Sequence, residues 1–164
     1  MSQLIATVSQ QIDYNYWAHR RVWAYVSKLT DDQYAQPLDY SQGSIHQQVV
    51  HTMWAEDIWF ARISDLPQPS YSAADFKDRA AVRAKWDAIE MQVRKMVRQF
   101  DDDQLIAPVS YQNSKGETFE QTVLQIILHL VNHGTDHRAQ TLAMMHVLGA
   151  ETVPQDLIYF YRLL

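Results

Sequence analysis

Apolar residues recur at the three- and four-residue spacing of an α-helix over four long stretches of the chain. The first stretch ends near Lys28, and the second runs from Ser44 to about Ile63. The third begins near Ser72 and ends before the aspartates at 101–103. The second stretch is apolar on nearly all sides, which is typical of a helix that several neighbours bury.

Residues 104–117 interrupt the helical pattern. Apolar and polar residues alternate there before an Asn-Ser-Lys-Gly segment, which predicts a turn in an irregular connection or a small hairpin. Thr118 and Gln121 have the spacing of a capping box at a helix N-terminus. The fourth helix is therefore expected over about 119–148, with Gly149 as its C-terminal cap.

Four long helices with mostly short connections predict an all-α protein, a four-helix bundle, in a single domain over residues 1–164. The sequence contains no internal repeat, no low-complexity segment and no linker long enough to divide it. The tail after Pro154 is too apolar to stay in solvent, so we expect it to pack on the bundle or on a second subunit.

The composition excludes several classes of protein. Hydrophobic residues make up 47% of the chain and charged residues 20%, which argues against disorder. Four glycines and five prolines are too few for the turns of a many-stranded sandwich or barrel. The absence of cysteine excludes a disulfide scaffold, a cysteine zinc finger, an iron–sulfur cluster and a thiol nucleophile.

The charge balance and the apolar stretches also limit the expected partners and location. The formal net charge is −5, so there is no excess of positive charge for binding nucleic acid. No stretch approaches the roughly 18 apolar residues of a membrane span, and the N-terminus lacks the features of a signal peptide. We therefore expect a cytoplasmic protein that contacts neither nucleic acid nor membrane.

Two of the seven histidines lie in the seam of the fourth helix that is expected to face the core. His133 and His137 are one turn apart and each lie within about 20° of the centre of that seam, whereas His129 lies about 60° away. The i, i+4 spacing is that of helical pairs that bind zinc. The alternative is a pair of core histidines, each hydrogen-bonded to a neighbour.

A third histidine from another helix would favour the metal site over that alternative. His51, inside the apolar second helix, is the better candidate, and His19, on the apolar face of the first helix, is its rival. His46 and His146 lie near helix ends and are expected to face solvent.

Residues 129–140, His-Leu-Val-Asn-His-Gly-Thr-Asp-His-Arg-Ala-Gln, closely resemble the fourth-helix motif of the DinB-like (DinB/YfiT) family. Residues 44–51 resemble the second-helix motif of that family, whose last histidine is a ligand. Three shorter segments also resemble the family, so the resemblance covers nearly the whole chain in order: Tyr16-Trp17-Ala18, Lys115-Gly116-Glu117 and Asp156-Leu157-Ile158-Tyr159.

The resemblance implies an up-down-down-up four-helix bundle that holds one divalent metal ion through His51, His133 and His137. Many relatives have a second histidine where this chain has Asp136, a departure that changes the local charge but not the implied ligands. Zinc or nickel is expected first, and iron or copper also suits imidazole ligation. The family resemblance is also compatible with a homodimer.

Three neutral imidazoles would leave a divalent ion with its full charge and an open coordination position, which is typical of catalytic sites. Such an ion lowers the pKa of a water or a thiol, and a thiol would come from a small molecule because the chain has no cysteine. The resemblance implies a metal-dependent small-molecule enzyme, either a thiol S-transferase or a hydrolase. The alternative is a catalytically silent module that binds a metal or another protein.

Carboxylates or amides should orient the imidazoles through their second ring nitrogens. Four side chains close in sequence could do so or could instead be solvated groups on helix surfaces: Glu56, Asp57, Asn132 and Asp136. Arg138 could bind an anionic part of a substrate or pair with a carboxylate across helices. Asp136, Arg138 and His19 are therefore the candidates for supporting the ligands or contacting the substrate.

Overall fold

Four long helices form where the apolar spacing is helical, in a computed structural model that describes residues 2–164. They are α1 (Gln3–Val26), α3 (Ile45–Ile63), α4 (Arg79–Val97) and α6 (Val123–Val147). Their buried apolar side chains meet in one core between the helices.

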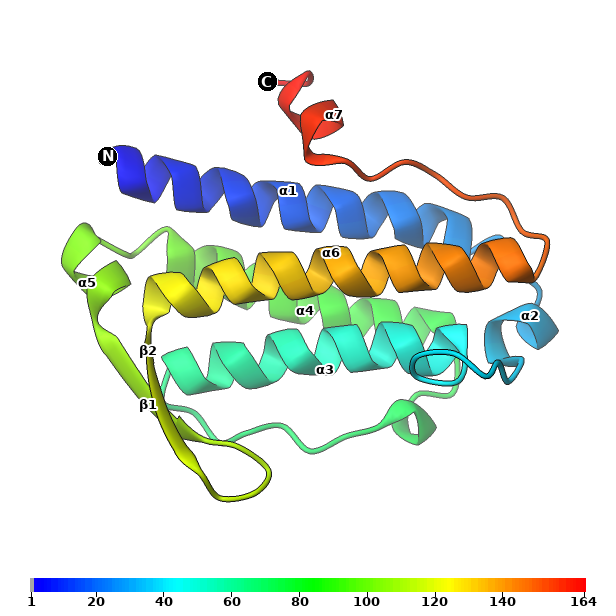
Figure 1. Cartoon of the computed structure of the whole chain (residues 1–164), viewed down its shortest axis with the longest axis horizontal. Helices are drawn as coiled ribbons and strands as arrows, with labels where there is room; N and C mark the ends of the chain where they lie inside the picture. Colours follow the sequence, from blue (N-terminus) through cyan, green and yellow to red (C-terminus); the bar gives the residue numbers. More distant parts are fainter. Residues whose placement is uncertain (1) are drawn as a thin grey trace.

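The four helices have the up-down-down-up order that the sequence predicts. Helices α1 and α6 run in one direction, and α3 and α4 run in the other (Figure 1). Residues 64–78 make this order possible, because they run back along the outside of the bundle, beside α3, from the end of α3 to the start of α4 (Figure 1).

The start of the third long helix differs from the prediction. Ser72 and Asp75 do form a capping box, but it caps only the single 3-10 turn η1 (Ala73–Asp75). Helix α4 begins at Arg79, where the Asp78 side chain accepts a hydrogen bond from the backbone N–H of Ala81. A capping pattern alone does not say how many turns will follow it, because the length of a helix depends on its packing.

The predicted hairpin is present and is longer than expected. Strands β1 (Pro108–Gln112) and β2 (Thr118–Thr122) pair antiparallel, with Gln112 opposite Thr118. Thr118 therefore lies in a strand, and the expectation that it caps the fourth helix was wrong. The cap is Thr122, which forms the capping box with Gln125.

Two short helices lie where the sequence indicated only polar breaks. They are α2 (Asp31–Ala35) and α5 (Asp102–Ile106), and each begins with a capping box. In the last turn of α6, Val147 continues the apolar spacing of the predicted seam but is 71% exposed. Gly149, with a φ of +70°, follows the C-terminal cap Leu148 rather than being the cap itself.

The apolar tail packs on the bundle, as one of the two alternatives predicted. It ends in helix α7 (Leu157–Tyr161), where buried Phe160 lies 6.0 Å from the Tyr14 ring and 5.8 Å from the Trp17 ring. Within residues 2–164, no helix combines the length and the hydrophobicity that a membrane span requires.

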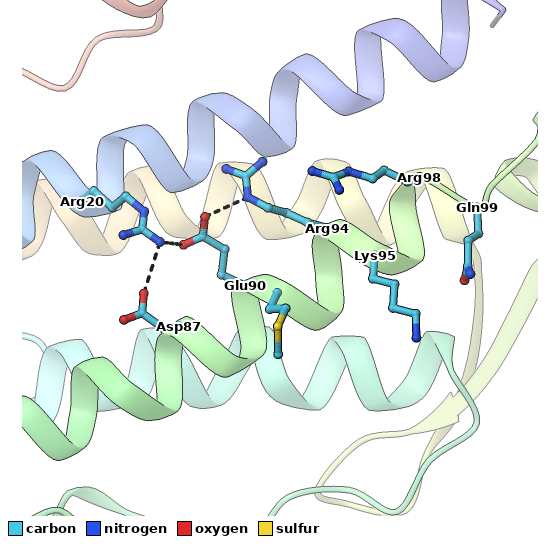
Figure 2. A pocket seen from close by; sticks show the side chains of 8 residues that line it. Arg20, Asp87, Glu90, Arg94, Lys95, Arg98 and Gln99 are labelled. Carbon is cyan, nitrogen blue, oxygen red and sulfur yellow. Dashed lines mark hydrogen bonds and ion pairs between the residues drawn. The ribbon is translucent and has the colours of Figure 1, made fainter.

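A groove of about 720 Å³ lies along α1 and α4 and is lined mainly by charged side chains (Figure 2). Arg20 donates hydrogen bonds to Asp87 (3.2 Å) and Glu90 (2.7 Å), and Arg94 donates to Glu90 (2.8 Å). The two Arg20 ion pairs link α1 to α4, whereas Arg94 and Glu90 both lie on α4. No histidine lines the groove, so it is separate from the histidine cluster described next.

Candidate metal centre

Helices α3 and α6 bring together His51, His133 and His137, and one ring nitrogen of each lies within 4.8 Å of the others. The Nε2 atoms of His133 and His137 are 2.9 Å apart, as their one-turn separation on α6 requires. The His51 ring faces them from α3, with its centroid 4.7 Å from that of His137. The structure therefore groups the three histidines that the sequence singled out.

The environment favours the neutral form of these three imidazoles. Burial lowers the pKa of His51, His133 and His137. For His133, burial and the nearby His137, His129 and His51 lower the pKa to about 3. Neutral imidazoles keep the nitrogen lone pair that a metal ion needs, so the cluster is in a form that can bind one near pH 7.

The cluster is open on one side. His137 is buried, whereas His51 and His133 are only half-buried. No carboxylate belongs to the cluster in the described part of the chain. Three nitrogen donors with an exposed side match the ligand number of a catalytic zinc site, which keeps one position for water or substrate.

Gln48 supports His137, a contact that the sequence analysis missed. Its side chain is fully buried, and its amide nitrogen Nε2 lies 2.5 Å from Nδ1 of His137. The same amide donates to Gln140 Oε1 (3.0 Å), and the Ser41 hydroxyl lies 2.7 Å from Gln48 Oε1. The available signal was its position in the second-helix motif, one turn before His51.

Asp136 and Arg138 have different surroundings. Asp136 is exposed, accepts a hydrogen bond from Gln140 (3.2 Å), and counteracts part of the lowering of the His137 pKa that burial causes. Arg138 is buried and donates to Asn15 Oδ1 (2.6 Å) and Thr135 Oγ1 (2.9 Å). Its guanidinium thus contacts amide and hydroxyl oxygens, not a carboxylate across helices.

His19 and Glu56 belong to a buried hydrogen-bonded group. His19 Nε2 lies 3.0 Å from Glu56 Oε1, which also accepts from Asn15 (3.0 Å), while Glu56 Oε2 accepts from Trp86 (2.8 Å). Burial opposes ionisation of Glu56, but attraction to His19 and these hydrogen bonds outweigh it and lower its pKa. This group ties α1, α3 and α4 together, and His19 is not part of the three-histidine cluster.

Gly134 allows α1 to approach α6, the helix that carries His133 and His137, closely. A Cβ atom at this position would lie 2.5 Å from Asn15 Oδ1 and 2.9 Å from Arg138 Nη1. The glycine between the two histidines therefore makes room for the hydrogen bond between Arg138 and Asn15.

His129 and two aromatic residues, Trp59 and Tyr111, extend from the cluster towards the hairpin. The His129 ring centroid is 5.5 Å from that of His133 and 5.3 Å from that of Trp59. Trp59 in turn contacts Tyr111 of β1 at 4.8 Å, and Trp54 flanks His51 at 6.1 Å on the other side. Aromatic side chains thus border the cluster along α3.

Known proteins share the fold of this chain, and a family model matches its sequence. The DinB family model matches residues 1–163. Protein DinB of Bacillus subtilis (strain 168) is 25% identical over 150 residues, which span 88% of this chain and 87% of that protein.

Solved structures share the fold at low sequence identity. YfiT from Bacillus subtilis, described as a probable metal-dependent hydrolase with an unusual four-helix bundle topology, has a TM-score of 0.71 and 15% identity, covering 92% of this chain and 91% of YfiT. A conserved protein from Enterococcus faecalis has a TM-score of 0.70 and 11% identity, covering 91% of this chain and 99% of its own.

Proposed function

This chain belongs to the DinB family, and we propose that it is a metal-dependent enzyme that acts on a small molecule. In this proposal His51, His133 and His137 are the ligands of one divalent ion. The observation that carries the proposal is the convergence of three ring nitrogens, from two helices, within 4.8 Å. The description of the structural neighbour YfiT as a probable metal-dependent hydrolase supports the same class of reaction.

The donor set fits a divalent ion of the first transition series. All-imidazole ligation suits zinc and nickel first, and it also suits iron and copper. When bound, such an ion would keep its double charge and lower the pKa of a water or thiol at its open position.

The side chains around the cluster hold the ligands in position. We infer that, with an ion bound, the Gln48 amide turns over, so that its oxygen replaces the nitrogen that faces Nδ1 of His137 here and accepts the Nδ1 proton, which leaves Nε2 free to bind the ion. Asp136 supports this arrangement through Gln140. Arg138 and His19 act further away, by holding α1 against α6 and α3.

Two reactions are compatible with this arrangement. In hydrolysis, the oxygen of water bonds to an electrophilic carbon of the substrate, and the leaving group departs with a proton. In thiol transfer, the sulfur of a low-molecular-weight thiol forms that bond instead. The chain itself contains no cysteine, so the sulfur would come from the second substrate.

Product analysis separates the two reactions. Zinc-loaded protein would be incubated with 4-nitrophenyl acetate, and separately with 1-chloro-2,4-dinitrobenzene plus cysteine, and the products identified by mass. We expect the product of one of the two assays to form faster with zinc-loaded protein than with metal-free protein or with the His133→Ala variant. Equal rates for all three proteins in both assays would contradict the proposed enzyme.

A second candidate function is a silent module that binds a metal or another protein. The end of the tail leaves Leu163 67% and Leu164 76% exposed. We propose that these side chains contribute to a homodimer interface. Both candidate functions are compatible with that interface. A silent module would bind one metal ion per chain and form neither product in the assays above.

A further inference from the structure

We propose that a cavity beside His51 binds the uncharged, apolar part of the substrate, an inference that rests on the proposed function. The cavity has a volume of about 260 Å³ and lies between α3, the loop before it and η1. Its lining consists of Gln42, Gln47, Val50, His51, Trp54, Tyr71, Ser72 and Ala73. A proposed metal ligand therefore forms part of its wall.

The lining is apolar inside and polar but uncharged at the mouth. Val50 is buried, and Trp54, Tyr71 and Ala73 are partly buried. Gln42, Gln47 and Ser72 are exposed. The lining contains no Asp, Glu, Lys or Arg, and its only ionisable side chains are those of His51 and Tyr71. A charged substituent would thus lose water here without gaining a counter-ion.

Tyr71 presents its ring, not its hydroxyl, to the cavity. The hydroxyl donates to Asp57 Oδ2 (3.2 Å), and that carboxylate also pairs with Lys85 Nζ (2.7 Å). The Tyr71 ring packs edge-on against Phe76, with ring centroids 5.4 Å apart. The polar end of Tyr71 is already bonded, so its ring forms a fixed apolar wall.

The cavity is open to solvent at its mouth, and its volume leaves room for one substituted ring, since an enclosed cavity of about 150 Å³ holds benzene. The groove along α1 and α4 is different, since six of its eight lining residues are charged (Figure 2). The inferred substrate is therefore a neutral electrophile with a single aryl-sized apolar group, whose reacting atom lies on the His51 side of that group.

The first experiment tests the cavity without any metal. Benzamide would be titrated into metal-free protein while the resonances of the Trp54 indole N–H and the Val50 methyls are followed by NMR. The Ala73→Phe variant fills the cavity, and Ala74→Phe is its matched control on the exposed side of the same 3-10 turn. We expect saturable shifts in the wild type and in Ala74→Phe, and at least about tenfold weaker binding in Ala73→Phe.

The second experiment tests whether this cavity serves the metal centre. With zinc-loaded protein, benzohydroxamate should bind at least about tenfold more tightly than acetohydroxamate, which lacks the ring. This preference should disappear in Ala73→Phe and persist in Ala74→Phe. If Ala73→Phe unfolds, Gln47→Trp at the exposed mouth takes its place.

The outcomes separate this inference from the proposed function. If benzamide causes no resonance shifts, or causes equal shifts in the Ala73→Phe variant, the inference is overturned, whether or not the protein binds zinc. Benzamide binding together with equal affinity for the two hydroxamates would also overturn it, because the cavity would not serve the metal. A protein that binds benzamide but no zinc would overturn the proposed function and, with it, the substrate role of the cavity.

Discussion

The side-chain amide of Gln48 lies 2.5 Å from Nδ1 of His137, across the interface between α3 and α6. Gln48 is fully buried and His137 nearly so, and the two residues are 89 positions apart in the chain. A hydrogen bond at Nδ1 determines which tautomer the ring adopts and therefore which nitrogen can bind a metal. The packing of α3 on α6 thus orients one of the proposed ligands.

Replacing Gln48 with methionine should weaken zinc binding about 10- to 100-fold, because methionine has a similar length but no oxygen to accept the Nδ1 proton. Gln48→Glu keeps such an oxygen and should bind zinc about as tightly as the wild type. Competition with a chromophoric chelator measures both affinities. Unchanged affinity in Gln48→Met would show that this contact does not orient the ligand.

Gly134→Ala should lower the free energy of unfolding by about 1–3 kcal/mol, because the added Cβ would crowd Asn15 and Arg138. The loss is expected although alanine favours a helix by about 1 kcal/mol over glycine. Urea unfolding measures it, and Asn132→Ala, at an exposed position of the same helix, should change stability by less than about 0.5 kcal/mol. An alanine variant at least as stable as the wild type would contradict the close approach of α1.

The metal-free protein should lose stability as the pH falls from 6.5 towards 4. Burial, followed by the charge of Arg138, lowers the pKa of His19 to about 4, despite the attraction of Glu56. In this range the unfolded chain binds a proton at His19 that the folded chain does not, so the free energy of unfolding decreases as the pH falls. His19 contributes up to about 3 kcal/mol to this loss.

The variant His19→Gln isolates that contribution, because glutamine can still donate to Glu56 but does not titrate. Urea unfolding at pH 7 and pH 4.5 would be compared for the two metal-free proteins. The loss of stability between these pH values should be smaller in the variant. Equal losses would mean that His19 is not held neutral by its burial.

The seam of α6 was predictable because it depends on local spacing. The pair His133 and His137, and the start of the second helix at Ser44, follow from short-range patterns, and the structure agrees with them. His51 was the better third candidate because it lies inside the apolar second helix, and the family motif supported it over His19. Its position opposite that pair depends on how α3 packs against α6. The late start of α4 at Arg79 was not predictable, since Ser72 and Asp75 satisfy the same local pattern as a longer helix would.

The supporting residues were harder to predict than the cluster itself. Glu56 is close to His51 in sequence, but its partners are His19, Asn15 and Trp86 from other helices. The side chain that contacts His137 comes from a different helix, as does the Asn15 oxygen that binds Arg138. Contacts of this kind depend on the three-dimensional packing of the helices, which no local pattern contains.

The number of metal ions per chain tests the central claim most directly. Elemental analysis of tag-free protein, purified without chelator and then equilibrated with zinc, should give about one zinc per chain. His51→Ala, His133→Ala and His137→Ala should each give a value near zero, whereas His129→Ala, beside the cluster but outside it, should retain one. A wild type that binds no zinc, or full occupancy in any of the three ligand variants, would contradict the proposed three-histidine site.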